Sequence, residues 1–488
     1  MDMNDNIDPP PICVRRLSSE RRKRARFLRQ RWIVLALICV IPLGSHFVRK
    51  ELGPLKTAML ADSRLGLDNT RFAMLLSATA LPNLLVPVFG GALLDIRGSR
   101  WGTMLFVVVT LLGQIAFASS VHLQWFLGAV LSQILVGVGA GSTVVSQAAI
   151  SSEYFQATEM GLAVGIMESV HNLSNWMGQA MPAEIMQFFG GNYVSSLWFG
   201  ALACAVSLIA GILYVKTDIN AEEETDRIRP MEDCTKKDRH VVLWKNVTNI
   251  TKLPKMFFGL TFLHMLLSTA HESFDNISAN LITVRYGASA VDAGLLASID
   301  NVFGLLLAPF VGILLDRLGY RLYFLSAMAL LLACAQALLA FGWHQLQGPL
   351  LPLIILGFVN SSVILGWDRG VRDDACKGYD TSFIEWGIAF GVFEASEAMG
   401  STVGNLLAGV LRDWTATYAL VNVGFMCFGI VCFAVSLAMA MSRSEEAQRL
   451  LKPLASEGYC NSSPESESPG GRTSAKNTNY GSFGEGKS

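Results

Sequence analysis

Charged residues are scarce in this chain of 488 residues. Asp, Glu, Lys and Arg make up 16% of it, and 52% of the residues are hydrophobic, whereas soluble domains usually carry about 25% charged residues. The scarcity comes from apolar runs of about 20 residues, the length that crosses a bilayer as a helix. A net charge of −1 shows no excess of basic residues, so we expect a lipid bilayer and no nucleic acid among its partners.

Motifs of enzymes and of nucleotide-driven pumps are also absent from the sequence. It contains no phosphate-binding loop, so ATP is not the expected energy source. It has no nucleophile elbow, zinc-ligand spacing or paired catalytic motif, and none of its nine cysteines falls in a predicted outward loop. We therefore predict a protein that is not an enzyme and needs no cofactor, metal or disulfide framework.

Twelve apolar stretches are long enough to span a membrane. They are too long and too uniformly apolar for the alternating strands of a membrane barrel, so we predict helices. The predicted spans are residues 32–52, 72–94, 101–119, 123–150, 160–185, 194–215, 256–282, 291–315, 320–342, 350–366, 383–410 and 418–441.

The distribution of Lys and Arg predicts the orientation. Nine of them lie between residues 15 and 31, and a second basic cluster lies in the central loop, whereas the loops near His122, Gly190 and Trp343 have none. Basic loops stay in the cytosol, so an even number of helices places both termini there. The exception is the first outward loop, which we expect to hold Lys56 and two arginines.

Two stretches of sequence occur twice in the same order. Residues 91–100 (GALLDIRGSR) match residues 312–321 (GILLDRLGYR), and residues 161–168 (GLAVGIME) match residues 387–394 (GIAFGVFE). The nearly equal offsets indicate duplicated halves, the plan of many transporters. We therefore divide the chain into a basic cytosolic arm (1–31), an N-terminal six-helix bundle (32–216), a cytosolic central linker (217–255), a C-terminal six-helix bundle (256–442) and a disordered cytosolic tail (443–488).

The first repeated pair resembles motif A of the major facilitator superfamily. Its glycines allow a tight turn, and its Asp can lie at the positive N-terminal end of a neighbouring helix. The resemblance implies a contact that holds the two halves together in an outward-open state; the alternative is a solvated charged turn. The motif residues are Gly91, Asp95, Arg97, Gly98 and Arg100 in the first copy, and Gly312, Asp316, Arg317, Gly319 and Arg321 in the second.

A narrower resemblance covers the second and third spans. Residues 89–91 (FGG), 100–103 (RWGT) and 113–114 (GQ) resemble the family of major facilitator superfamily domain-containing protein 1, whose members are lysosomal uniporters for dipeptides. The resemblance implies an all-α membrane protein with twelve transmembrane helices in two pseudo-symmetric six-helix bundles. The acidic residue and the arginine that bind a dipeptide's charged ends in that family align here with Gly141 and Asn172.

Polar side chains recur on one face of several predicted spans. A charge at the bilayer centre costs roughly 2.5–3.5 kcal/mol or more, so we expect these groups to line a hydrated cavity for substrate binding or proton coupling. Histidine suits proton transfer because imidazole titrates near neutrality. The alternatives are hydrogen bonds between helices and, for residues 49–51, a place at the outer interface. The candidates are Glu168, His171, Asn172, His271, Glu272, Glu394, Glu397 and His46.

The residues after Met441 are rich in Ser, Gly, Glu, Asn and Lys and are predicted to be disordered. Within them, Glu446, Leu450 and Leu451 resemble an acidic dileucine sorting signal. This pattern predicts recognition by sorting adaptors and delivery to a lysosomal or vacuolar membrane. The plasma membrane is the alternative.

Together these features predict a multi-pass secondary transporter that moves a small organic solute by alternating access, as a uniporter or coupled to protons. The family resemblance implies a dipeptide or a related amino-acid compound. The alternatives are another solute, such as a carboxylate or a sugar, and a non-transporting membrane sensor or escort. Polar stripes in both halves favour transport, because a scaffold does not need a costly hydrated centre. An accessory membrane subunit is a further candidate partner.

Overall fold

The structure, a computed structural model, describes residues 30–442 with gaps at 87–88, 91–92, 95–98, 156, 227–254, 319, 343–347 and 362–382. Within these residues it contains helices and no strand. Seven helical segments of the described chain are long and apolar enough to cross a membrane. They are Gln30–Ala61, Ser99–His122 (α6), Phe126–Ser151 (in α7, Phe126–Tyr154), Tyr193–Asp218 (in α9, Tyr193–Asp226), Ala290–Leu307 (α12, Ala290–Ala297, and the start of α13, Ile299–Leu318), Arg321–Phe341 (α14) and Ala419–Met441 (α17).

The other five predicted spans also fall on helices, which are either short or carry the polar residues. The second span is broken at Pro82, where α4 gives way to a 3-10 turn. The long helices of this group carry the candidate Glu and His residues at their centres. The five are α4 (Asn69–Ala80) with η1 (Leu81–Leu84), α8 (Ala157–Phe188), α11 (Lys255–Tyr286), the helix Leu350–Ser361, and α16 (Phe383–Thr415).

The first span is longer than the sequence predicts. It includes α2 (Leu43–Lys50) and α3 (Leu52–Ala61), and the backbone bond from Glu51 N to Phe47 O (3.1 Å) continues the helix between them. Lys56 was predicted in a loop, and this prediction is wrong, because Lys56 lies in α3 with 2% of its surface exposed. Its Nζ donates to the Tyr418 hydroxyl at 3.1 Å and lies 5.2 Å from the centre of the Phe72 ring. These contacts replace the water that a loop would have provided.

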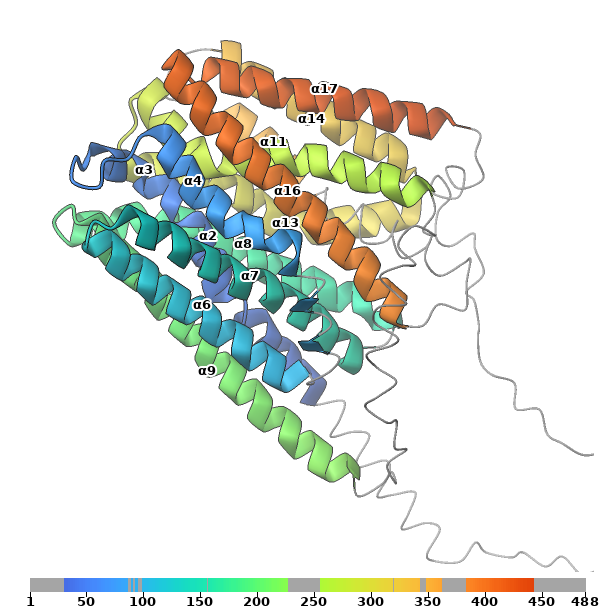
Figure 1. Cartoon of the computed structure of the whole chain (residues 1–488). Coiled ribbons are helices and arrows are strands. Elements are labelled where there is room, and N and C mark those ends of the chain that lie inside the picture. Colours follow the sequence, from blue (N-terminus) through green and yellow to red (C-terminus); the bar gives the residue numbers. More distant parts are fainter. Residues whose placement is uncertain are drawn as a thin grey trace, which may run out of the picture.

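The helices form two groups that lie against each other along their length. The N-terminal half (residues 30–226) contains α2 to α9, and the C-terminal half (residues 255–442) contains α11 to α17. Figure 1 shows α6, α7 and α9 below α11, α14 and α17, with α16 running along the boundary. We call the end at the left of this view the α3–α4 end, and the opposite end, where α9 finishes and α11 begins, the α9–α11 end.

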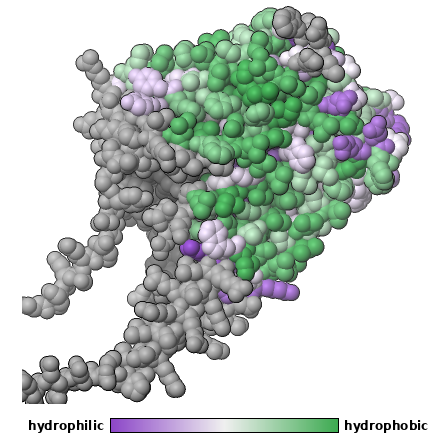
Figure 2. Space-filling model, turned by 180° about the vertical axis from the view of Figure 1, so that it is seen from behind, coloured by the Kyte–Doolittle hydropathy of each residue, from purple (hydrophilic) through white to green (hydrophobic). Residues whose placement is uncertain are grey.

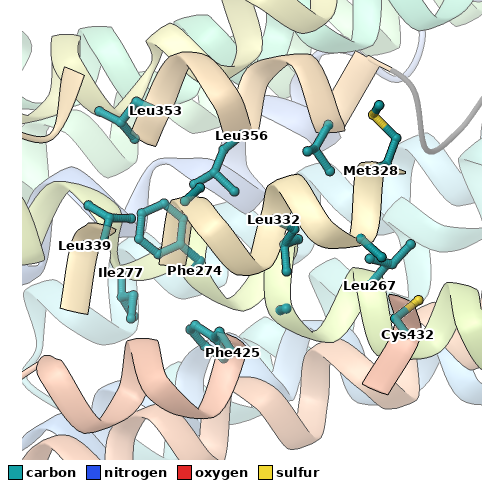
Figure 3. Packing of buried hydrophobic residues seen from close by; sticks show 14 of the residues in the cluster. Leu267, Phe274, Ile277, Met328, Leu332, Leu339, Leu353, Leu356, Phe425 and Cys432 are labelled. Carbon is teal, nitrogen blue, oxygen red and sulfur yellow. The ribbon is translucent and has the colours of Figure 1, made fainter. Parts of the chain in front are cut away.

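Each half has an apolar core of its own. In the C-terminal half, Leu267 and Phe274 of α11 pack with Leu332 of α14 and Phe425 of α17, and all four are at most 3% exposed. Figure 3 shows these side chains meeting between the helices, with Leu356 above them. The outward surface is apolar too. Figure 2 shows hydrophobic residues over its middle and hydrophilic residues gathered at one end, as expected of a surface that contacts lipid acyl chains.

The seams between the halves depend on small residues. A Cβ added at Gly53 of α3 would lie 3.2 Å from the Asn276 carbonyl oxygen of α11. One added at Gly294 of α12 would lie 2.8 Å from the Gln179 carbonyl oxygen of α8. Without side chains at these positions, helix backbones of the two halves approach closely, as in other membrane helix pairs.

At the α3–α4 end a carboxylate of one half caps a helix of the other. Asp413, in the last turn of α16, accepts hydrogen bonds from the backbone N–H groups of Asn69 (3.2 Å) and Thr70 (2.7 Å), which begin α4. It also accepts from the side chains of both residues. A negative charge at this position satisfies free N–H groups and complements the helix dipole. The two halves are therefore fastened together at this end.

We expect Gly44→Ala to destabilise the N-terminal half, because its new Cβ would lie 2.6 Å from the Cys204 Cα of α9. Overpacking of this kind costs about 1–3 kcal/mol. Gly424→Ala in α17 is the matched control, since no atom lies within 4 Å of its added Cβ and removing a helical Gly is neutral or stabilising by about 0.5–1 kcal/mol. Thermal unfolding of detergent-purified protein measures both; equal midpoints would contradict the close α2–α9 packing.

Candidate functional site

A buried cluster of ion pairs between α2 and the middle of α11 joins the two halves. Lys50, at the end of α2, places its Nζ 2.8 Å from Glu272 Oε2 and 2.5 Å from Asp275 Oδ2, both on α11. The Lys50 and Asp275 side chains are 6% and 2% exposed. Because lysine comes from one half and both carboxylates from the other, the contact fixes the halves to each other. We call these three residues the ion-pair cluster.

Amides extend the ion-pair cluster along the seam. Gln179 of α8 donates to Asp275 Oδ1, and Asn301 of α13 donates to Gln179 Oε1 at 3.0 Å. Each carboxylate oxygen of Asp275 therefore has a donor, one from Lys50 and one from Gln179. Buried carboxylates need such donors to offset the loss of hydration. The chain of contacts passes from α2 through α11 and α8 to α13.

His271 and Asp300 form a second contact, within the C-terminal half. His271 Nε2 lies 3.0 Å from Asp300 Oδ2, within ion-pair distance of a protonated imidazole. Asp300 is 1% exposed. On the other side, His271 Nδ1 lies 4.0 Å from the Glu272 carboxylate. The imidazole therefore lies between two carboxylates.

The N-terminal half supplies a histidine cluster, formed by His46, Glu168, His171 and Gln147. The rings of His46 and His171 stack with their centres 4.2 Å apart. His171 Nε2 lies 2.9 Å from Gln147 Oε1, and its Nδ1 lies 3.6 Å from Glu168 Oε1. The structure thus brings together three candidates that the sequence assigned to the first and fifth spans. Gln147, on α7, was not among them.

The two candidate glutamates of α16, Glu394 and Glu397, lie in different surroundings. Glu397 Oε2 lies 3.5 Å from Nε2 of His264 on α11, whose ring stacks on Phe393 at 3.8 Å. Glu394 makes no hydrogen bond or ion pair with a described residue, although it interacts electrostatically with Glu168 across the seam. Glu168 and Glu394, equivalent positions of the internal repeat, therefore face a common region.

Gly141 and Asn172, which the sequence resemblance singles out as uncharged positions, make neutral contacts. A Cβ on Gly141 of α7 would lie 2.0 Å from Asn83 Oδ1, so an amide of η1 fills that space. Asn172 donates to the Glu168 carbonyl oxygen at 3.1 Å and accepts from Asn360 at 3.5 Å. The second contact spans the two halves, which gives Asn172 a role in the seam.

Half of the ten motif A residues lie outside the described residues: Gly91, Asp95, Arg97, Gly98 and Gly319. Gly312, Asp316 and Arg317 lie in α13, but their surroundings are not described. Arg100 begins α6 and pairs with Asp218 of α9, which also accepts from Tyr154. Arg321 is buried at the start of α14. The sorting residues Glu446, Leu450 and Leu451 fall beyond the described chain.

A comparison with known families matches residues 35–368 to the Major Facilitator Superfamily. The chain belongs to this superfamily. Membership confirms the resemblance drawn from motif A, and it makes the chain a membrane transporter rather than an enzyme. The helical structure in two groups agrees with the superfamily's architecture.

Curated relatives resemble this member of the superfamily at low identity. The lysosomal dipeptide transporter MFSD1 of Bos taurus is 24% identical over 431 residues, covering 84% of each chain. Its Homo sapiens counterpart is 23% identical over 440 residues, covering 86% of this chain and 88% of the relative. The riboflavin transporter RibZ of Clostridioides difficile is 28% identical over 169 residues, 33% of this chain and 35% of that protein.

Solved structures share the fold. A POT family transporter in complex with a thioalcohol-conjugated peptide superposes with a TM-score of 0.62 at 16% identity, covering 86% of this chain and 96% of that one. A POT family transporter in complex with 5-aminolevulinic acid gives a TM-score of 0.61 with the same identity and coverage. At this identity the likeness supports the major facilitator fold alone.

We expect Lys50→Met to lower the stability of the protein by about 3–5 kcal/mol, because it leaves Glu272 and Asp275 buried without their cation. Lys50→Met combined with Asp275→Asn should recover part of that loss, since one uncompensated charge is removed as well. Thermal unfolding of the two single variants and the double variant measures the coupling. Strictly additive effects would show that the cluster does not act as a unit.

Proposed function

We propose that this superfamily member is a secondary transporter for a dipeptide or a related amino-acid compound, working by alternating access as a uniporter or with proton coupling. Its architecture would be the twelve-helix one: two pseudo-symmetric bundles at residues 32–216 and 256–442, joined by a cytosolic linker and with both termini in the cytosol. The relatives named as lysosomal dipeptide transporters support this substrate class.

The observation that carries the proposal is the ion-pair cluster between the halves. A buried ion pair is weak evidence for stability, because the cost of removing two charges from water cancels much of their attraction. A charged solute that competes for Lys50, Glu272 or Asp275 would change how strongly the halves hold each other. Binding would then bias the equilibrium between conformations, which is the coupling that transport requires.

The histidines supply the route to proton coupling. His171 lies beside Glu168 in one half, and His271 lies between Glu272 and Asp300 in the other. Chains of Asp, Glu and His side chains serve as proton relays in membrane pumps and transporters. Under the uniport alternative, the same groups orient the solute and exchange no proton with it. Transport measured with and without a pH gradient separates the two modes.

Uptake by purified protein in liposomes tests the proposal across dipeptides, amino acids, carboxylates and sugars, between about pH 5 and pH 8. We expect dipeptide uptake, and we expect Glu272→Gln to lower it about tenfold through loss of a charge-assisted hydrogen bond to Lys50. Asp275 remains to hold Lys50, so this variant should fold.

Glu184→Gln is the matched control, because Glu184 is exposed on α8 away from the cluster. It should transport like the unaltered protein. Uptake of sugars or carboxylates alone would overturn the substrate class. Absence of all uptake by correctly folded protein would favour a sensor or an escort.

We propose a lysosomal or vacuolar membrane as its location, on the basis of the relatives' names and of the dileucine pattern. Changing Leu450 and Leu451 to Ala should move a fluorescently tagged chain from that membrane to the cell surface. Leu454→Ala, in the same tail, should leave the distribution unchanged. An unaltered distribution of the double variant would contradict the dileucine signal.

A further inference from the structure

Arg49 of α2 is a cation at the seam with which no described residue forms a pair. Its neighbour Lys50 is held by two carboxylates, whereas Arg49 has no hydrogen bond or ion pair among the described residues. Guanidinium groups inside a membrane protein normally face a partner or a hydrated space, because their burial alone is expensive. The sequence alone left a place at the outer interface open for Arg49, and the extension of the first span to Ala61 favours a place further inside.

Arg49 lies on the accessible side of α2, and this side faces the candidate site. Along this helix, Leu43, His46 and Arg49 are partly exposed, while the residues between them are buried. A spacing of three residues places these side chains on one face of a helix. That face includes His46, which stacks on His171 of the histidine cluster. Arg49 therefore lies on the same face as a group that contacts α8.

Carboxylates of the opposite half surround this cation at a distance. Glu272, Glu394 and Glu397 all interact electrostatically with Arg49. None of them forms an ion pair with it. Residues 392–397 of α16, which include both glutamates, are partly exposed. Opposite charges thus face each other across the seam without closing into a contact.

We propose that Arg49 binds the carboxylate end of the substrate, and that Glu394 with Glu397 binds its ammonium end, so that the solute is a zwitterion held between the two halves. This inference rests on the proposed function. A guanidinium can hold a carboxylate through two parallel hydrogen bonds, which a lysine cannot do. An ammonium group has three donors, enough for two carboxylates.

This arrangement needs no charge at Gly141 or Asn172. Both positions make neutral contacts in the structure. The cation is supplied by α2 and the anions by α16. Lys50 cannot take the role of Arg49 while it remains paired with Glu272 and Asp275.

Binding of leucyl-alanine, lysyl-alanine and aspartyl-alanine to the purified full chain tests the assignment by thermal-shift titration. Each dipeptide is used free, as its C-terminal amide, and with its N-terminus acetylated. For the unaltered protein, we expect each blocked form to bind about tenfold to a hundredfold more weakly than the free dipeptide, the loss expected for a charged hydrogen-bonded contact.

Arg49→Gln should bind the free and the amidated dipeptide equally, while it still rejects the acetylated form. The double variant Glu394→Gln/Glu397→Gln should show the opposite pattern. Arg64→Gln is the control, because Arg64 is an exposed loop residue paired with Asp62, and it should keep both preferences. If Arg49→Gln does not fold, Arg49→Lys replaces it in the test. This variant keeps the charge, and its preference for the free over the amidated dipeptide should fall about tenfold.

The outcomes separate the two proposals. If the unaltered protein binds none of the dipeptides, the proposed substrate class fails, and this assignment fails with it. If it binds them but the Arg49 variants still prefer the free carboxylate, Arg49 is not the anchor and the transport proposal stands. Equal loss of all three forms in both variants would also contradict separate binding of the two ends.

Discussion

Charge inside a membrane must be compensated, and in this protein the compensation crosses from one half to the other. Lys50 is buried with Glu272 and Asp275, which lie more than 200 residues away along the chain. Removing Lys50 would leave two bare carboxylates where each buried charge costs several kcal/mol. The positions of α2 and α11 follow from this requirement, and the amides of Gln179 and Asn301 complete it.

The contacts at the α3–α4 end are individually modest, which suits a seam that opens. A carboxylate at a helix N-terminus contributes about 0.3–1 kcal/mol, and up to about 2 kcal/mol when it is partly buried. Asp413 makes such a contact with α4. Lys56 adds a side-chain hydrogen bond to the Tyr418 hydroxyl. Reversing a two-state equilibrium from 1:99 to 99:1 needs about 5.5 kcal/mol. Under the proposed function, about three to six contacts of 1–2 kcal/mol, lost together, would be enough to change which end is open.

The sequence predicted the helices well because apolar runs are local, and it predicted the partners poorly because pairing is not. Glu168, His171 and Asn172 share one helix face, so their proximity followed from spacing. Nothing local indicated that Lys50 would meet α11. The end of the first span was predicted wrongly for a related reason. A lysine is expected in a loop, and only the folded structure shows that Lys56 is held inside a helix by the Tyr418 hydroxyl and the Phe72 ring.

The internal repeat gives the two halves matching positions, but their chemistry has diverged. Glu168 lies beside a histidine that is hydrogen-bonded to Gln147, whereas its counterpart Glu394 has no partner among the described residues and lies within electrostatic range of Arg49. A site with true two-fold symmetry would present the same groups to both ends of a solute. A zwitterion has unlike ends, so it is recognised only where the symmetry is broken. Under the proposed function, Arg49 on α2 breaks that symmetry and fixes the orientation of the bound solute.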